Sequence, residues 1–132
     1  MPYWRGLPLR NSAVLLIVPF IAFLSGCGAN AEHTAEVTTG GDVHRGAVAI
    51  AHYGCGSCHT IPGISGATGR VGPPLNGIAT RTYVAGMLQN TPANLERWIE
   101  NPQSVVPNNA MPNLGLSHQD AIDIAGYLYT LR

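Results

Sequence analysis

The most constraining feature of this 132-residue chain is the run Cys55-Gly56-Ser57-Cys58-His59. Two cysteines separated by two residues, with a histidine directly after them, form the attachment signature of a c-type haem. The two thiols bond covalently to the haem, and the histidine is the proximal ligand of its iron. The run therefore predicts one covalent haem c, which cannot dissociate and around which the rest of the chain must fold.

Two other kinds of site use a C-x-x-C pair, and the sequence disfavours both. A structural zinc site needs a second pair of ligands, but the chain has no further C-x-x-C and no H-x3-5-H. A thioredoxin-like redox pair belongs to a β-α-β context, and long β-branched runs that would form its strands are missing. Cys55 and Cys58 are therefore interpreted as haem-attachment residues.

The N-terminal residues predict export, which fits a haem attached outside the cytoplasm. Two arginines precede an apolar stretch from Ala13 to Leu24, as in a signal peptide, and this stretch is shorter than the ~20 residues of a membrane-spanning helix. Leu24-Ser25-Gly26-Cys27 resembles a bacterial lipobox. The resemblance implies that residues 1–26 are a lipoprotein signal peptide, that Cys27 carries lipid, and that the protein is anchored in the bacterial cell envelope on its periplasmic or extracytoplasmic face. The alternative is an ordinary secretory peptide cut nearby, with Cys27 as a leftover thiol.

The charge of the exported part limits its partners. From residue 27 onward five arginines stand against seven acidic residues, and the chain contains no lysine. Nucleic acids and anionic lipids are bound by clustered cations, so neither is expected to bind this surface. Membrane attachment is therefore expected to depend on the lipid.

Composition divides the exported chain into two parts. Residues 27–41 are rich in Ala, Glu, Thr and Gly without an apolar period, which predicts a flexible tether. Residues 42–132 are long enough for one small folded domain. The Gly- and Pro-rich residues 62–74 within it are predicted to be a loop.

Capping residues and apolar spacing predict mainly helices in the domain. Asp42, Thr91 and Ser117 each precede a stretch with helical apolar spacing, and all three are good N-cap residues. The last of these helices is expected to run to the chain end. A short segment around residues 82–88 is also predicted to be helical, and the strand signal is poor throughout. The expected fold class is therefore all-α.

The haem iron still needs a sixth ligand or an open coordination position. Met87 lies in the predicted short helix, where a methionine usually fills the core. Met111 lies next to Pro112 in a stretch without helical pattern, where the surrounding fold could direct its thioether at a metal. The other possible donors lie in or beside the tether, just before the haem motif, or at the start of the last helix: His33, His44, His52 and His118.

From Asp42 to Arg132 the chain resembles a small monohaem class I cytochrome c. Besides the haem motif, the resemblance rests on Gly72-Pro73-Pro74-Leu75-Asn76-Gly77 and on Asn101-Pro102, which is followed nine residues after the proline by Met111. It implies the all-α cytochrome c fold, with three to five helices around one covalent haem and crossing N- and C-terminal helices. Gly46 would allow the close backbone approach at that crossing.

The resemblance also implies a role for each matching residue. His59 and Met111 would be the two axial ligands of the iron. The carbonyl of Pro73 would accept a hydrogen bond from the other ring nitrogen of His59. Arg81 would pair with a haem propionate, and Trp98 would lie beside the methionine and the haem.

Ligation by histidine and methionine predicts an electron carrier and not an enzyme, because the iron keeps no vacant position for oxygen or peroxide. The expected function is that of a monomeric, membrane-tethered cytochrome in a respiratory chain. Residues 81–131 also resemble cytochrome c domains of subunit II of some terminal oxidases, which implies redox partners such as a membrane oxidase or dehydrogenase. Two alternatives stay open: a haem-bearing subunit fixed in an oxidoreductase complex, and a haem enzyme or gas sensor with a displaceable sixth ligand.

Overall fold

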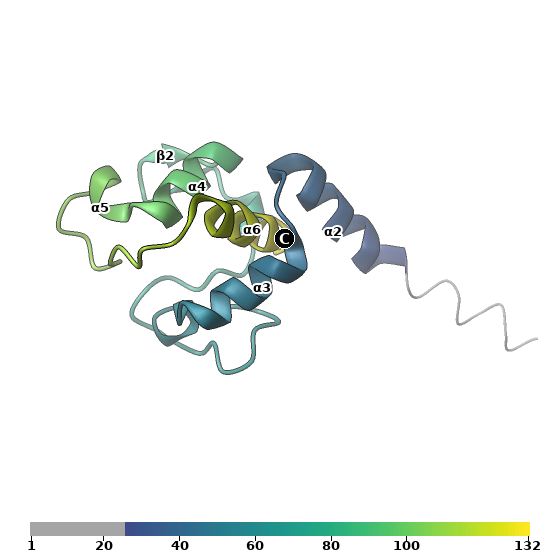
Figure 1. Cartoon of the computed structure of the whole chain (residues 1–132), viewed down its shortest axis with the longest axis horizontal. Helices are drawn as coiled ribbons and strands as arrows, with labels where there is room; N and C mark the ends of the chain where they lie inside the picture. Colours follow the sequence, from purple (N-terminus) through teal and green to yellow (C-terminus); the bar gives the residue numbers. More distant parts are fainter. Residues whose placement is uncertain (1–25) are drawn as a thin grey trace, which may run out of the picture.

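The computed structural model describes residues 26–132, and within them the chain is mostly helical (Figure 1). The predicted all-α fold class is confirmed. The signal peptide predicted for residues 1–26 lies outside the described residues apart from Gly26. In chain order the elements are helix α2 (Gly26–Thr39), α3 (Val43–His52), the 3-10 helices η1 (Cys55–Ser57) and η2 (Ile78–Thr80), strands β1 (Tyr83–Val84) and β2 (Leu88–Gln89), and helices α4 (Pro92–Glu100), α5 (Pro102–Val105) and α6 (His118–Tyr129).

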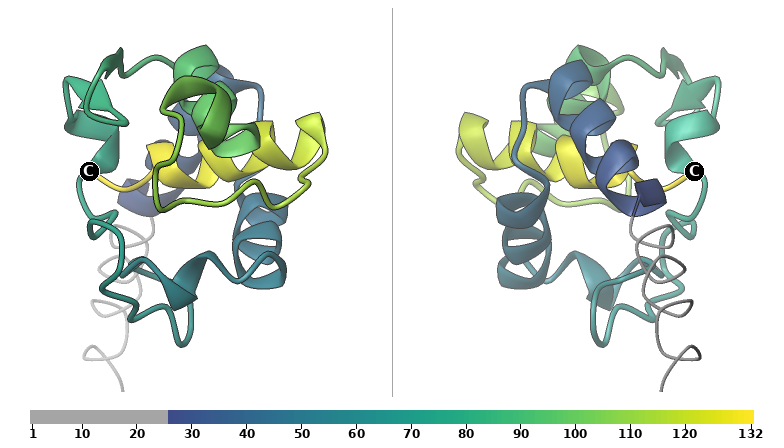
Figure 2. Two further views of the ribbon diagram at one scale, coloured as in Figure 1. Left: turned by 90° about the vertical axis from the view of Figure 1, so that its left-hand side faces the viewer. Right: turned by 90° about the vertical axis from the view of Figure 1, so that its right-hand side faces the viewer.

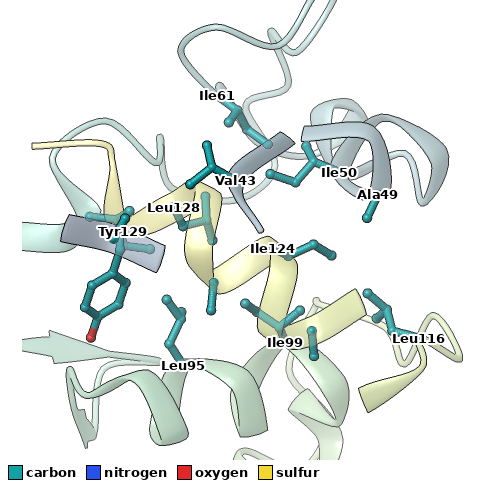
Figure 3. Packing of buried hydrophobic residues seen from close by; sticks show 14 of the residues in the cluster. Val43, Ala49, Ile50, Ile61, Leu95, Ile99, Leu116, Ile124, Leu128 and Tyr129 are labelled. Carbon is teal, nitrogen blue, oxygen red and sulfur yellow. The ribbon is translucent and has the colours of Figure 1, made fainter. Parts of the chain in front are cut away.

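Helix α6 lies at the centre of this arrangement and packs against α2, α3 and α4 (Figures 1 and 2). Ser117 caps its start, because the Ser117 hydroxyl accepts a hydrogen bond from the Asp120 N–H, as predicted for a capping residue. Figure 3 shows Ile124 and Leu128 between the apolar side chains of α3 and α4. Both are at most 3% exposed, and burying a side chain of this size contributes about 1.5–3 kcal/mol.

The crossing of α3 and α6 depends on Gly46. Asp42 caps the start of α3, because its carboxylate accepts a hydrogen bond from the Arg45 N–H at 2.8 Å. One turn further on, a Cβ added at Gly46 would collide with the carbonyl of Asp123 in α6. Only glycine lets the two backbones approach so closely, and the predicted role of this residue at the crossing is confirmed.

A buried carboxylate fixes the same crossing. Asp123 is 2% exposed, and it accepts hydrogen bonds from the Asp42 N–H at 2.8 Å, from Arg45 Nε at 2.7 Å and from Gln119 Nε2 at 3.0 Å. Burial alone would raise the pKa of Asp123, but these hydrogen bonds, led by that from Arg45, hold the pKa below its ordinary value. The charged form of Asp123 therefore links the start of α3 to α6.

The segment around residues 82–88 is a hairpin, so the prediction of a short helix there was wrong. Strands β1 and β2 pair antiparallel, with Val84 opposite Leu88. Ala85 and Gly86 have φ angles of 54° and 72°, which a right-handed helix does not use, and the Met87 N–H closes the turn by donating to the Val84 carbonyl at 3.2 Å. Met87 consequently lies 59% exposed at the hairpin tip and does not fill the core.

Residues 27–41 also differ from the prediction, because most of the expected flexible tether is helix α2. The buried face of this helix is centred on Ala35, which is 1% exposed, and the helix packs mainly on α6. A buried face so poor in large apolar residues leaves no hydrophobic period in the sequence. Gly40, with φ of 76°, ends the helix, and its N–H bonds to the Glu36 carbonyl at 2.7 Å. In residues 26–132, no helix combines the length and apolar character needed to cross a membrane.

Candidate functional site

A cavity of about 490 Å³ lies between the segment that follows α3 and the segment that follows α5. Both segments face the viewer in the left view of Figure 2. The volume falls within the range of about 300–1,000 Å³ that is usual for ligand and cofactor pockets, and most of the wall is apolar. All the residues predicted to bind the cofactor line this cavity: Cys55, Cys58, His59, Pro73, Arg81, Trp98 and Met111.

The two cysteines and the histidine lie in one tight turn at the end of α3. Gly54 takes a left-handed conformation with φ of 68°, which ends α3 and starts η1. The N–H groups of Cys58 and His59 both point to the Cys55 carbonyl, at 3.2 and 3.0 Å. This turn brings both thiols to the cavity wall. Burial raises the pKa of the Cys55 thiol.

The His59 ring is held by the loop that follows it. Its Nδ1 lies 2.7 Å from the Pro73 carbonyl, and because a carbonyl can only accept, Nδ1 carries the proton and Nε2 keeps the lone pair that can bind a metal. A Cβ on Gly72 would collide with the imidazole, so glycine lets the loop lie against the ring. The hydrogen bond expected between His59 and Pro73 is present.

Arg81 and Trp98 reach the cavity from two further elements. The Arg81 guanidinium donates to the carbonyls of Pro74 and Asn76, which holds a cation beside the loop that carries Pro73. Trp98 is half-buried on α4, the helix that buries Leu95 in the core. The cavity wall therefore offers the Arg81 guanidinium to an anionic group and the Trp98 ring as an aromatic surface.

Met111 comes from a loop without regular structure and is half-buried in the cavity wall. Its N–H donates to Oδ1 of Asn109 at 2.7 Å, and its carbonyl accepts from Nε2 of Gln103 at 2.8 Å. Neither Gln103 nor Asn109 was predicted from the sequence to belong to the site. The signal that could have indicated them is the scarcity of backbone donors in a loop that contains Pro107 and Pro112.

The donors and the wall of the cavity fit a covalent haem. Two thiols at the attachment spacing, an imidazole nitrogen and a thioether sulfur meet in one cavity, and nitrogen and sulfur are the axial donors of cytochrome c iron. The apolar wall suits a porphyrin, and Arg81 offers a charge partner for its carboxylates.

Residues 43–132 match the family model described as Cytochrome c. The chain belongs to the cytochrome c family. This membership confirms the predictions of a class I c-type cytochrome and of covalently attached haem c. It also supports the prediction of an electron-carrying haem protein.

Three curated relatives of this cytochrome include two oxidase subunits. It is 30% identical over 112 residues to cytochrome c oxidase subunit 2 of Alkalihalophilus pseudofirmus, with 84% of this chain and 31% of the relative covered. It is 32% identical over 88 residues to cytochrome c oxidase subunit 2 of Bacillus sp. (strain PS3), with 64% of this chain and 25% of the relative covered. It is 34% identical over 98 residues to cytochrome c2 of Agrobacterium tumefaciens, with 63% of this chain and 85% of the relative covered. The chain thus spans less than a third of the length of the two oxidase subunits. No solved structure matches it.

Proposed function

We propose that this cytochrome is tethered to a membrane outside the cytoplasm and carries single electrons in a respiratory chain, and that His59 and Met111 would hold the iron of its haem. When bound, the haem supplies an iron that alternates between Fe(II) and Fe(III) by exchanging one electron. The observation that carries the proposal is that Cys55, Cys58, His59 and Met111, from two distant parts of the sequence, line one mostly apolar cavity.

In this proposal Cys55, Cys58 and His59 fix the cofactor in the cavity. Cys55 and Cys58 hold it through two thioether bonds. His59 presents Nε2 as a ligand, and the hydrogen bond from its Nδ1 to Pro73 sets both the tautomer and the orientation of the ring.

Met111 and the wall of the cavity would tune the redox potential of the haem and limit the access of water to it. The Met111 thioether is neutral and soft, which favours the reduced iron and a high potential. Arg81, already held on two carbonyls, would pair with a propionate. Trp98 would cover part of the haem surface and exclude water from it.

The optical spectrum of the purified holoprotein tests the ligation. We expect low-spin iron and, in the oxidised protein, a methionine-to-iron charge-transfer band that Met111→Ala abolishes. Met87→Ala is the matched control, because Met87 is 59% exposed at the hairpin tip, and this variant should keep the band. High-spin iron in the unaltered protein would contradict the proposed ligation and favour an enzyme or sensor.

The membrane tether is proposed to be a lipid on Cys27, which lies in the first turn of α2. Cleavage before Cys27 would remove Gly26 from α2 (Gly26–Thr39), and at 1.5 Å per residue the rest of the helix would span about 20 Å. Since Ala35 packs this helix onto the domain, the lipid would sit at the end of a stiff arm. Mass spectrometry of the mature N-terminus tests the modification, with Cys27→Ser as the unlipidated control, and an unmodified Cys27 in the membrane fraction would contradict it.

A terminal oxidase is the proposed partner, supported by the similarity to two oxidase subunits. The cavity rim exposes Val71, Tyr83 and Leu114, and the chain has no lysine. Apolar contact is little screened by salt, so the rate of electron transfer to the oxidase should change little with ionic strength. The same similarity supports the alternative of a subunit fixed in a complex. Stoichiometric co-purification from gently solubilised membranes would favour the fixed subunit over the mobile carrier.

A further inference from the structure

The loop that carries Met111 has an unusual source of hydrogen bonds. Residues 106–116 contain no helix or strand, and Pro107 and Pro112 have no N–H group to donate. A loop of this kind must satisfy its polar groups with side chains or water. Two amide side chains, those of Gln103 and Asn109, do so on both sides of Met111.

Gln103 lies in α5 and uses both ends of its half-buried amide. Its Nε2 donates to the carbonyl of Met111 at 2.8 Å and to the carbonyl of Asn109 at 3.0 Å. Its Oε1 accepts from the Asn108 N–H at 3.0 Å. One side chain thereby joins the short helix to three residues of the loop.

Asn109 completes the arrangement from inside the loop. Its Oδ1 accepts from the Met111 N–H at 2.7 Å. Its Nδ2 donates to the carbonyls of Val106 at 2.6 Å and Pro102 at 3.1 Å. Both main-chain polar groups of Met111 are therefore bound by amide side chains, and one of these side chains is itself tied back to α5.

We propose that Gln103 and Asn109 are positioning residues that hold the Met111 thioether on the iron. The inference rests on the proposed function, in which Met111 is the sixth ligand. A thioether is a neutral, soft ligand that binds oxidised iron less well than reduced iron. Its retention in the oxidised state therefore depends on how few other conformations the loop can adopt. Weakening the two amide contacts should release Met111 from the oxidised protein first and lower the potential.

Two near-isosteric variants test the inference in the holoprotein. Gln103→Glu keeps the acceptor for Asn108 but turns an oxygen toward two carbonyls, so two hydrogen bonds are lost. Asn109→Asp keeps the acceptor for Met111 and loses both donations from Nδ2. Gln89→Glu and Asn30→Asp are the matched controls, because both residues are exposed and lie outside the cavity wall.

The main readout is the binding of added imidazole to the oxidised protein, which requires Met111 to leave. We expect Gln103→Glu to bind imidazole about tenfold more tightly or better, as the loss of two hydrogen bonds implies, with a weaker charge-transfer band and a lower potential. Asn109→Asp should likewise raise the affinity for imidazole, weaken the charge-transfer band and lower the potential. Both controls should match the unaltered protein.

The outcomes separate this inference from the proposed function. If Met111→Ala keeps the charge-transfer band, the ligand assignment itself fails. If Met111→Ala loses the band while Gln103→Glu and Asn109→Asp bind imidazole as the controls do, only the positioning role is overturned. If neither variant folds, amide hydrogen exchange of the unaltered oxidised protein decides: a slowly exchanging Met111 N–H supports the role, and exchange at the rate of a free loop overturns it.

Discussion

Gly46→Ala should destabilise the protein although alanine is the better helix former. The added Cβ would lie 2.7 Å from the carbonyl carbon of Asp123 and 3.0 Å from Tyr127 Cβ. The carbonyl oxygen of Asp123 would lie nearer still, so restoring a normal carbon separation of about 3.5 Å is the least that is needed, and α3 would move away from α6 by at least roughly 0.8 Å. The obstacle is the backbone of the opposite helix, which cannot rotate aside as a side chain could.

The change in the free energy of unfolding of Gly46→Ala is the difference between a packing cost and a gain in helix propensity. Overpacking of this kind costs about 1–3 kcal/mol, and the upper end applies because a gap of roughly 0.8 Å weakens every dispersion contact across the crossing. The gain in helix propensity from glycine to alanine returns about 1 kcal/mol. The net loss in the free energy of unfolding should therefore be about 2 kcal/mol.

Gly28→Ala is the matched control, because a Cβ at Gly28 in α2 meets nothing within 4 Å. It should leave the stability unchanged or raise it slightly. Urea unfolding of the holoproteins, followed by circular dichroism, measures both effects. With an m-value near 2 kcal/mol/M, the midpoint of Gly46→Ala should fall by about 1 M. A midpoint equal to or above that of the unaltered protein would refute the argument that the two backbones touch at Gly46.

Three further changes test other parts of the fold. The pKa of Asp123 is lowered because hydrogen bonds, led by that from Arg45, outweigh burial, so the stability from its charged form is present above about pH 4 and lost as the pH falls through the folded-state pKa. The midpoints of the unaltered protein and Asp123→Asn should thus differ by a constant amount above about pH 4 and converge as the pH falls below it, and a difference that stays constant below about pH 4 would contradict this. Ala35→Glu should detach α2 from the domain and speed amide hydrogen exchange over residues 31–39. Val37→Glu is the control, because Val37 is 73% exposed, and it should leave the exchange rates unchanged. Equal exchange rates in both variants would show that α2 is not packed through Ala35. Thr91→Ala removes the side chain that accepts from the Asn94 N–H at the start of α4 and should cost about 1 kcal/mol in urea unfolding, so an unchanged midpoint would count against the cap.

The helices that the sequence predicts correctly are those with a local signal at their start. Asp42, Thr91 and Ser117 each accept a hydrogen bond from the N–H three residues further on. This interaction depends on residues close in the sequence, so it can be inferred before the tertiary structure is known.

The two errors concern segments whose structure depends on distant contacts or on rare backbone angles. Helix α2 buries Ala35 against α6, and an alanine in a polar segment gives no hydrophobic period. The turn of the hairpin places Ala85 at a φ of 54°, a conformation for which glycine or asparagine would have been the usual signal. Helix α2 has no residue type from which its packing could be inferred, and in the hairpin Gly86 gives only half of the usual turn signal, because Ala85 precedes it.

The functional site also contains both residues that a local sequence pattern identifies and residues that only the folded structure identifies. Cys55, Cys58 and His59 could be identified because haem attachment requires a fixed spacing. Gln103 and Asn109 could not, because an amide that binds loop carbonyls can come from any position that the fold brings near. Their contacts with Met111 are visible only in the folded chain.

The position of Met111 can be traced back to the core without reference to the haem. Helix α5 is a single turn and would not be stable alone, but Asn101 caps it and Pro102 is buried. Asn101 directly follows α4, whose Leu95 is 1% exposed in the core. On the other side of the cavity, His59 is held by the Pro73 carbonyl. Because the protein fixes His59 and Met111 through separate contacts, both side chains would stay in place whichever oxidation state a bound haem had, which is the property that an electron carrier requires.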